Sequence, residues 1–279
     1  MKIFNNIKFT NFNFYSDETG FECTVTADDH MHSDVIFFKF DKPIGKISNN
    51  LVFTALMTLV GCNWYKNASF DLSISKHIYE KASSISNTKI IVKDLNYIED
   101  IDKRNTYDGN VLSLSGGIDS NALYFLLQKG GVSFHAIGTD FGVTYAKDTD
   151  VCHGRVELTM STNIRDNSTK YVADQKTWEF MGIASILTID HFHTKNILFG
   201  MVNQYDRYLR TIFGDKNRKV RAADSKFFSI VNVKMQGIQF LTEFQNAIIV
   251  LDNIKDSVFM QKIIDASATT RHRNKFFRK

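Results

Sequence analysis

The stretch that decides the fold reads Val111-Leu112-Ser113-Leu114-Ser115-Gly116-Gly117-Ile118-Asp119-Ser120-Asn121-Ala122. It opens as a short apolar strand, turns at two adjacent glycines and continues into a helical pattern that ends near Lys129. A strand, a glycine turn and a helix in this order are typical of an open parallel sheet, where ligands bind at the carboxyl ends of the strands. The stretch therefore predicts an α/β fold and the place of a binding site.

The turn that follows this strand has the composition of an anion site. Gly116 and Gly117 carry no Cβ, so backbone amides can approach a ligand closely. The helix that follows adds amide donors and a partial positive charge at its first turn. Ser115 and Ser120 add hydroxyl donors, and Asp119 fits such a site if it holds Mg²⁺, which would bridge it to phosphate oxygens. The turn therefore predicts a pyrophosphate site with a magnesium ion.

Other motifs that bind phosphate or carry a nucleophile do not fit this stretch. A Walker A motif needs a lysine after the glycines, and neither that lysine nor a G-x-G-x-x-G is present. A G-x-S-x-G elbow fails because Ser113 stands two residues before Ser115. The remaining alternative is an ordinary glycine turn whose Ser and Asp side chains cap a helix.

The run Ser115-Gly116-Gly117-Ile118-Asp119-Ser120 resembles the S-G-G-x-D-S loop of the PP-loop ATP pyrophosphatases. That superfamily includes asparagine synthetase, NAD synthetase, GMP synthetase and 7-cyano-7-deazaguanine synthase. The resemblance implies a parallel-sheet, Rossmann-like (HUP) domain that cleaves ATP between the α and β phosphates, depends on Mg²⁺ and forms an adenylated substrate. It also implies that the loop binds the released pyrophosphate and that Asp119 is both a catalytic residue and a metal ligand.

Four later segments fit the same resemblance. The strand that ends at Thr139-Asp140 stands where members of the superfamily contact adenosine, and Gly200 closes the fourth strand. Asn163 and Arg165 follow the third strand, where an arginine could stabilise phosphate charge during attack. Asp206 could bind metal or substrate. A surface ion pair for Arg165 and a charged helix face for Asp206 are the alternatives. The expected cofactor-binding residues are Ser113, Ser115, Gly116, Gly117, Ile118, Asp119, Ser120, Thr139, Asp140, Asn163 and Gly200.

Two departures separate this chain from particular members of the superfamily. Deazaguanine synthases hold zinc with a C-terminal cysteine cluster, whereas residues 271–279 contain no cysteine. Asparagine synthetase carries an N-terminal cysteine nucleophile, whereas residue 2 here is Lys2. We therefore expect neither that zinc site nor built-in ammonia production.

The pattern of the chain changes near residue 105. Residues 1–105 combine short strand-like runs with two helical runs, which predicts a small α+β accessory domain, and residues 96–110 look like a linker. Residues 106–279 alternate strands and helices, which predicts the PP-loop domain with a basic C-terminal tail. The strands are expected at 111–114, 132–138, 155–160 and 196–200, and the helices at 51–60, 120–129, 171–192 and over most of 240–266.

Composition limits the class of protein further. The chain has 279 residues, of which 43% are hydrophobic and 23% charged, so it can bury a sizeable core. The net charge is +4, but residues 271–279 hold five Lys and Arg and no acid, so the excess belongs to a tail rather than to a face. Cys23, Cys62 and Cys152 stand far apart, which favours reduced thiols in the cytoplasm. The apolar run at 51–62 is too short to span a bilayer, and no signal peptide is expected.

These observations favour an AMP-forming ligase that uses ATP and Mg²⁺. We expect it to activate a carboxylate or carbonyl oxygen of a small-molecule or peptide acid for attack by ammonia or an amine. Two alternatives stay open. One is a nucleotide-binding module that acts through a protein partner, for which residues 1–105 offer a surface. The other is an enzyme that adenylates a tRNA base and uses the basic tail to contact phosphates.

Overall fold

The computed structural model describes residues 4–27, 33–61, 65–98, 102–142, 150–165, 179–200, 226–237, 241 and 243–267. The strands are β1 (Phe4–Phe14), β2 (Gly20–Ala27), β3 (Ser33–Phe40), β4 (Tyr65–Ser73), β5 (Lys89–Asp94), β6 (Gly109–Ser113), β7 (His135–Asp140), β8 (Leu158–Thr162), β9 (Thr194–Phe199) and β10 (Lys234–Gly237). The helices are α1 (Asn49–Val60), α2 (Lys76–Ile85), α3 (Ile118–Lys129), α6 (Ile183–Leu187), α8 (Lys226–Ile230), α9 (Glu243–Asn253) and α10 (Ser257–Ser267), with the 3₁₀ helices η1 (Asp102–Thr106) and η4 (Glu179–Gly182).

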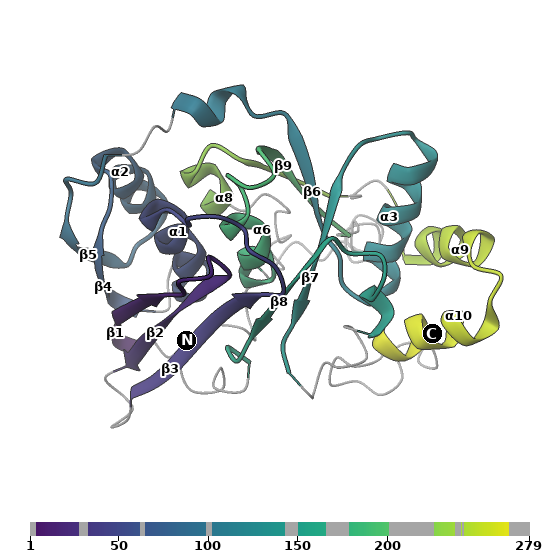
Figure 1. Cartoon of the computed structure of the whole chain (residues 1–279), viewed down its shortest axis with the longest axis horizontal. Coiled ribbons are helices and arrows are strands. Elements are labelled where there is room, and N and C mark those ends of the chain that lie inside the picture. The colour runs from purple at the N-terminus through teal and green to yellow at the C-terminus, as the bar shows by residue number, and fades with distance from the viewer. Residues whose placement is uncertain are drawn as a thin grey trace, which may run out of the picture.

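Within the described residues, one 10-stranded sheet runs through the molecule in the order β10-β9-β6-β7-β8-β3-β2-β1-β4-β5 (Figure 1). Strands β6 to β10 are all parallel, with β7 and then β8 on one side of β6 and β9 and then β10 on the other. In chain order this is 3-2-1-4-5, the doubly wound pattern. Because the chain returns to the other side of β6 at β9, the carboxyl ends of these two strands form the switch point where such sheets bind ligands.

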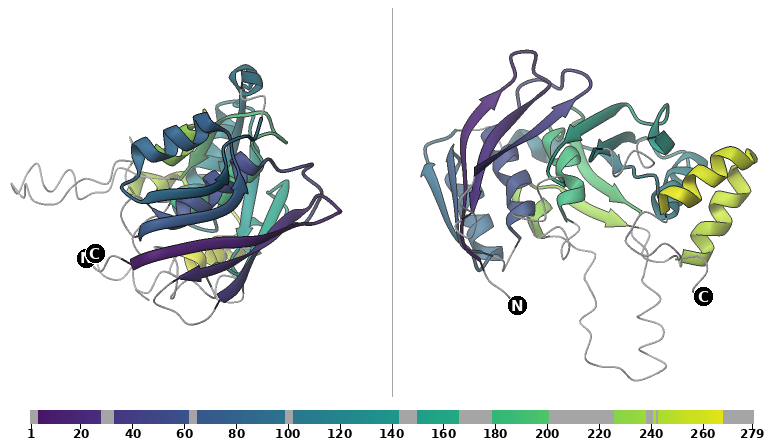
Figure 2. Two further views of the ribbon diagram at one scale, coloured as in Figure 1. Left: turned by 90° about the vertical axis from the view of Figure 1, so that its left-hand side faces the viewer. Right: turned by 90° about the horizontal axis from the view of Figure 1, so that it is seen from below.

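Alternate side chains of these strands feed two apolar clusters, one on each face of the sheet. Val111 and Ile197 belong to a cluster that includes α1, α6 and α8, whereas Leu112 and Leu198 belong to a cluster with α3, α9 and α10. Figures 1 and 2 show these two groups of helices on opposite sides of the central strands. The prediction of an α/β fold with a mostly parallel sheet covered on both faces is confirmed.

The first 105 residues join the same sheet through an antiparallel pairing of β3 with β8. Phe38 pairs with Thr162 and Phe40 with Met160. Beyond β3, the strands β2 and β1 continue antiparallel, and β4 and β5 run parallel to β1. In Figure 2 the strands β1, β2 and β3 extend beyond the helices that pack on them. The two parts expected from the sequence thus share one sheet and one of the two apolar clusters.

Helix α1 is the buried helix that the apolar run predicts. The Ser48 side chain caps it by accepting a hydrogen bond from the Leu51 amide, and Gly61 ends it with a positive φ of 69°. All of its residues after Asn49 are buried, because the helix lies between the sheet and the helices η4, α6 and α8. Among the helices that the structure describes, none has the length and apolar character needed to cross a membrane.

Some elements differ from the sequence prediction. Of the long helix expected over 171–192, residues 171–178 lie outside the described residues, and α6 ends at Leu187 because the chain turns over 188–193, where His193 has a positive φ of 47°, before it enters β9. The third strand of the parallel sheet starts at Leu158 rather than at 155. Strands β4 and β10 were not predicted. Strand β4 was missed because polar residues at its exposed positions interrupt the apolar run, and β10 was missed because it has only four residues.

An ion pair between the buried Arg104 and the partly exposed Asp190 connects the predicted linker to the core. Arg104 of η1 is only 3% exposed and donates to both carboxylate oxygens of Asp190, at 2.8 Å from Nε and 2.7 Å from Nη2. The same Nη2 donates to Ser48 Oγ at 3.3 Å, and the Tyr107 hydroxyl donates to Asp190 Oδ1 at 3.3 Å. These contacts connect the start of β6, the turn before β9 and the cap of α1. Residues near the expected boundary therefore form part of the folded core.

Removing the charge of Asp190 should destabilise the protein. The substitution Asp190→Asn leaves the Arg104 guanidinium buried without its counter-charge, and we expect the free energy of unfolding to fall by about 2 kcal/mol, less than for a fully buried pair because Asp190 is 34% exposed. Urea denaturation measures this change. The matched control is Glu80→Gln in the exposed Lys76–Glu80 pair, for which we expect less than about 0.5 kcal/mol. Equal small effects of both substitutions would contradict a stabilising role for the Arg104–Asp190 pair.

Candidate functional site

The S-G-G-x-D-S loop lies at the switch point of the sheet. It connects β6 to α3, whose N-cap is Gly117 and whose first residue is Ile118. The first amides of a helix have no carbonyl acceptor within that helix, so they are the donors that such a position can offer to an anion. The Ile118 side chain packs against the apolar cluster beneath α3, which leaves only its backbone on the side of the loop. The local order of strand, turn and helix is the one that the sequence predicts.

The Asn121 side chain sets the direction of the loop's peptide groups. Its Nδ2 donates to the carbonyls of Ser115, Gly116 and Gly117 at 3.5, 3.1 and 2.8 Å, and the residue is fully buried. In a trans peptide the C=O and the following N–H point in opposite directions. Because three consecutive carbonyls turn toward Asn121, the amides of Gly116, Gly117 and Ile118 point away from it. Successive amides with one common direction make a concave anion-binding surface.

The buried Ser120 side chain stabilises the same loop through several hydrogen bonds. Its hydroxyl donates to the Ser115 carbonyl at 2.6 Å, lies 3.1 Å from the Gly117 carbonyl and is 2.9 Å from the Ser115 hydroxyl. It also accepts from the Ser115 amide at 3.2 Å. Ser120 is buried, so it holds the loop in shape rather than presenting a hydroxyl donor at the surface. Ser115 is partly exposed and is the serine of this pair that lines a neighbouring pocket.

Gly200, the residue after β9, lies directly against the first turn of α3. A Cβ at Gly200 would be 2.2 Å from the Ser120 backbone nitrogen and 2.5 Å from the Asp119 carbonyl carbon. Any side chain would therefore push the loop away from β9, because backbone atoms cannot move aside cheaply. The structure thus brings together the two sides of the switch point, Ser113 at the end of β6 and Gly200 directly after β9.

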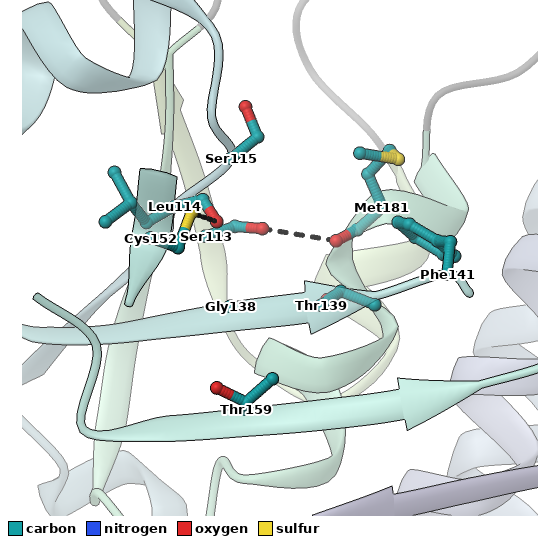
Figure 3. Close-up of a pocket in the computed structure, with 9 residues that line it drawn as sticks. All are labelled: Ser113, Leu114, Ser115, Gly138, Thr139, Phe141, Cys152, Thr159 and Met181. Atoms are coloured by element: carbon teal, nitrogen blue, oxygen red, sulfur yellow. Dashed lines mark hydrogen bonds between the residues drawn. The ribbon is translucent and has the colours of Figure 1, made fainter. Parts of the chain in front are cut away.

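A pocket opens beside the loop, over β7 and β8. Its cavity volume is about 20 Å³, which is on the scale of a single bound water molecule. Hydroxyl groups stand among apolar side chains and the backbone of a glycine on its wall. Ser115 belongs to both the loop and the pocket, so the two are continuous. The lining residues are Ser113, Leu114, Ser115, Gly138, Thr139, Phe141, Cys152, Thr159 and Met181 (Figure 3).

Two internal hydrogen bonds fix the walls of this pocket. The Ser113 hydroxyl donates to the Met181 carbonyl at 3.1 Å, which ties the end of β6 to η4 across the pocket (Figure 3). The Cys152 thiol donates to the Leu114 carbonyl at 3.5 Å on the other wall. Thr139 and Thr159 come from the neighbouring strands β7 and β8, where Gly138 pairs with Thr159. The pocket is therefore built on paired strands rather than on loops alone.

Arg165 lies behind two residues of the pocket wall. Its guanidinium carbon is 4.5 Å from the ring centre of Phe141 and 5.1 Å from that of Phe180, and Nη2 lies 3.5 Å from Met181 Sδ. A guanidinium is attracted to aromatic faces and is weakly hydrated, so this is a stable place for its charge. Of the predicted catalytic residues, Arg165 thus contacts the pocket wall, and Asp119 stands at the loop.

Asp119 faces helix α9. Its Oδ1 accepts a hydrogen bond from Asn246 Nδ2 at 3.0 Å, and the carboxylate is partly exposed at the first turn of α3. Within the described ranges, no group of three or more His, Cys, Asp or Glu side chains could hold a metal ion. Asp206, the other predicted ligand, lies outside these ranges. One carboxylate beside phosphate oxygens and water is a sufficient protein contribution for Mg²⁺, so Asp119 fits that ion.

The other predicted binding residues have different surroundings. Thr139 lines the pocket, whereas Asp140 uses Oδ1 to accept from the Gly142 amide at 2.9 Å, in the turn after β7. The Asn163 carboxamide accepts from the Phe37 amide at 3.1 Å and donates to the Val35 carbonyl at 2.9 Å. The Asn163 side chain therefore supports the joint between β3 and β8.

Sequence reasoning missed two asparagines of this site. Asn121 is the residue directly after the motif. Its position one helical turn after Gly117 could have indicated its role, because a side chain there can reach back to the loop. Asn246 is 127 positions from Asp119 and carries no local signal. Phe141, Cys152 and Met181 were also not assigned to the pocket, since apolar residues at such positions look like core.

No family model matches the chain, and neither do curated proteins or solved structures. The function therefore has to be inferred from the geometry of the site itself.

The close contact between Gly200 and α3 can be tested with a matched pair of alanine substitutions. Gly200→Ala forces a Cβ into backbone atoms, and we expect the free energy of unfolding to fall by about 2 kcal/mol. Gly138→Ala meets its nearest neighbour, Val156 Cγ1, at an ordinary 3.5 Å, so we expect a change below about 1 kcal/mol. Thermal and urea denaturation measure both. If the two variants were equally stable, β9 and α3 would not be in the contact described.

Proposed function

We propose that this chain is a PP-loop ATP pyrophosphatase with a HUP-type domain. It would transfer the adenylyl group of ATP to an oxygen of an acid substrate, release pyrophosphate and pass the activated group to ammonia or an amine. The observation that carries the proposal is the turn of the three loop carbonyls onto Asn121, which directs the loop amides away from that side chain at the switch point. The 3-2-1-4-5 strand order and the adjoining pocket support it.

The nucleotide would lie across the loop and the pocket. The β and γ phosphates would accept hydrogen bonds from the amides of Gly116 and Gly117 at the positive end of α3. The nucleoside would lie over Gly138 and Thr139, since Ser115 belongs to both the loop and the pocket, and the pocket would have to widen to admit it. The α-phosphorus would then sit near Ser115, between the two parts of the site.

The chemistry consists of two displacements. A carboxylate or carbonyl oxygen of the substrate attacks the α-phosphorus and forms an oxygen–phosphorus bond. The bond from that phosphorus to the bridging oxygen breaks, and its electron pair leaves on pyrophosphate. The nitrogen of ammonia or an amine then bonds to the activated carbon of the substrate. The bond from that carbon to the adenylated oxygen breaks, AMP leaves with this oxygen and the electron pair, and the nitrogen releases a proton.

The protein would contribute mainly positioning and charge neutralisation, as is usual in phosphoryl transfer. The loop amides would stabilise the charge that builds on the departing pyrophosphate. Mg²⁺ held by Asp119 would supply positive charge at the phosphates when bound. Arg165, which lies against the rings of Phe141 and Phe180, adds positive charge behind the pocket wall.

The proposal includes the setting of the reaction. The substrate would be a small-molecule or peptide acid, and residues 1–105 would offer the surface for a protein partner. We place the reaction in the cytoplasm, which the free thiols of Cys23 and Cys152 support.

The reaction class is tested by the products formed from ATP. Incubation of the full chain with MgATP and a panel of carboxylic acids should yield AMP and pyrophosphate, measured by ion-exchange chromatography. Asp119→Asn keeps the size of the side chain but removes the charge that holds Mg²⁺, and we expect the rate to fall by about 100-fold. Asp252→Asn, on the exposed side of α9, should leave the rate unchanged.

Other products would decide against the proposal. ADP and phosphate would contradict cleavage between the α and β phosphates. Tight binding of ATP or AMP with no turnover would favour the nucleotide-binding module instead. Salt-sensitive RNA binding that disappears when residues 271–279 are deleted would favour the enzyme that adenylates a tRNA base.

A further inference from the structure

Asn246 has an unsatisfied oxygen next to the carboxylate of the proposed site. The residue is fully buried on α9, and its Nδ2 donates to Asp119 Oδ1 at 3.0 Å. Its Oδ1 is buried and has no hydrogen-bond partner among the residues that the structure describes. A buried acceptor left without a donor is unfavourable, because it has lost its hydrogen bonds to water and gained none in the protein. Such an atom beside a carboxylate indicates that another group belongs there.

The two ends of a carboxamide can exchange places by rotation of the side chain, because the oxygen and the nitrogen have nearly the same size and position. Without a cation, the Asn246 nitrogen faces Asp119, since an amide oxygen and a carboxylate oxygen at that distance would repel each other. With a cation between them the preference reverses, because carboxamide and carboxylate oxygens are both good ligands for Mg²⁺. Rotation would sacrifice no hydrogen bond at Oδ1, which makes none in this state.

The separation of the two side chains suits this exchange. Neighbouring ligands of an octahedral Mg²⁺ lie at right angles at about 2.1 Å from the ion, so they are about 3.0 Å apart. The observed distance from Asn246 Nδ2 to Asp119 Oδ1 is 3.0 Å. The atom that replaces Nδ2 after rotation would therefore stand at the spacing of a neighbouring ligand. The other positions of the ion would be filled by water and by phosphate oxygens at the loop.

We propose that Asn246 Oδ1 and the Asp119 carboxylate together bind a divalent cation, with the Asn246 carboxamide turning over when the ion arrives. The phosphate ligands of this site rest on the proposed function, whereas the two protein ligands do not. Helix α9 then belongs to the site, although its sequence contains no recognised motif.

The rival role for Asn246 is that of a positioning residue, a hydrogen-bond donor that only orients Asp119. The two roles predict opposite effects of Asn246→Asp. A carboxylate at this position supplies an oxygen that can bind the metal but has no hydrogen to donate to Asp119. If Asn246 is a metal ligand, Asn246→Asp keeps that function; if Asn246 is only a donor, Asn246→Asp loses it. Asn246→Ala removes both. Asn253→Ala is the matched control, because Asn253 is on the same helix and bonds its carboxamide to the Ile249 carbonyl of α9 itself.

The experiment measures Mn²⁺ binding to the full chain by loss of the free Mn²⁺ signal in electron paramagnetic resonance. It is done with Mn²⁺ alone and with added inorganic pyrophosphate. We expect Asn246→Ala to weaken Mn²⁺ binding by about tenfold. Asn246→Asp should bind at least as tightly as the parent chain, and Asn253→Ala should bind like the parent. Thermal denaturation without metal checks that each variant is folded.

The inference is overturned if Asn246→Ala binds Mn²⁺ like the parent chain, or if Asn246→Asp and Asn246→Ala are weakened equally. Its failure can be distinguished from failure of the proposed function. If Mn²⁺ binding depends on Asn246 as expected but MgATP yields no AMP, the cation site stands and the proposed activity falls. If AMP is formed and Mn²⁺ binding does not depend on Asn246, the activity stands and this site falls.

Discussion

The candidate site depends on one fully buried carboxamide. Asn121 draws three consecutive carbonyls to one nitrogen, and the geometry of the peptide bond then obliges the following amides to face the other way. Without that contact, two glycines in succession would leave the turn free to adopt many conformations. The loop is thus organised before any ligand arrives, and a ligand would not have to order it.

The sheet gives this organised loop its surroundings. Ser113 ends β6 and Gly200 directly follows β9 at the switch point, and the contact of Gly200 with the first turn of α3 holds the helix against β9. The pocket then follows from the next strands, since Gly138 and Thr159 are paired neighbours beside the loop. Helix α9 closes the other side by bringing Asn246 to Asp119. The end of β9, the paired strands β7 and β8, and helix α9 therefore all meet at the loop between β6 and α3.

The sequence predicts the local features of this arrangement better than the distant ones. The strand, turn and helix at 109–129 were recognised because their signals lie within a few residues of one another. The order of the parallel strands was not predicted, since pairing depends on contacts between segments far apart in the chain. Asn163 shows the same limit: its place after β8 suggested a ligand contact, whereas its carboxamide bonds to the backbone of β3 more than a hundred residues away. The residues next to Asn163 in the sequence do not indicate that its side chain bonds to the backbone of β3.

The antiparallel contact of β3 with β8 has a consequence for how the chain could be rearranged. Without β3, β8 would become the border of the parallel sheet, with a row of peptide groups open to any other chain. Phe38 and Phe40, both fully buried, would also lose their place in the shared core. Residues 1–105 therefore cannot simply be exchanged for another domain. A replacement domain would have to supply a strand that pairs with β8 in the same register, together with apolar side chains that fill the shared core.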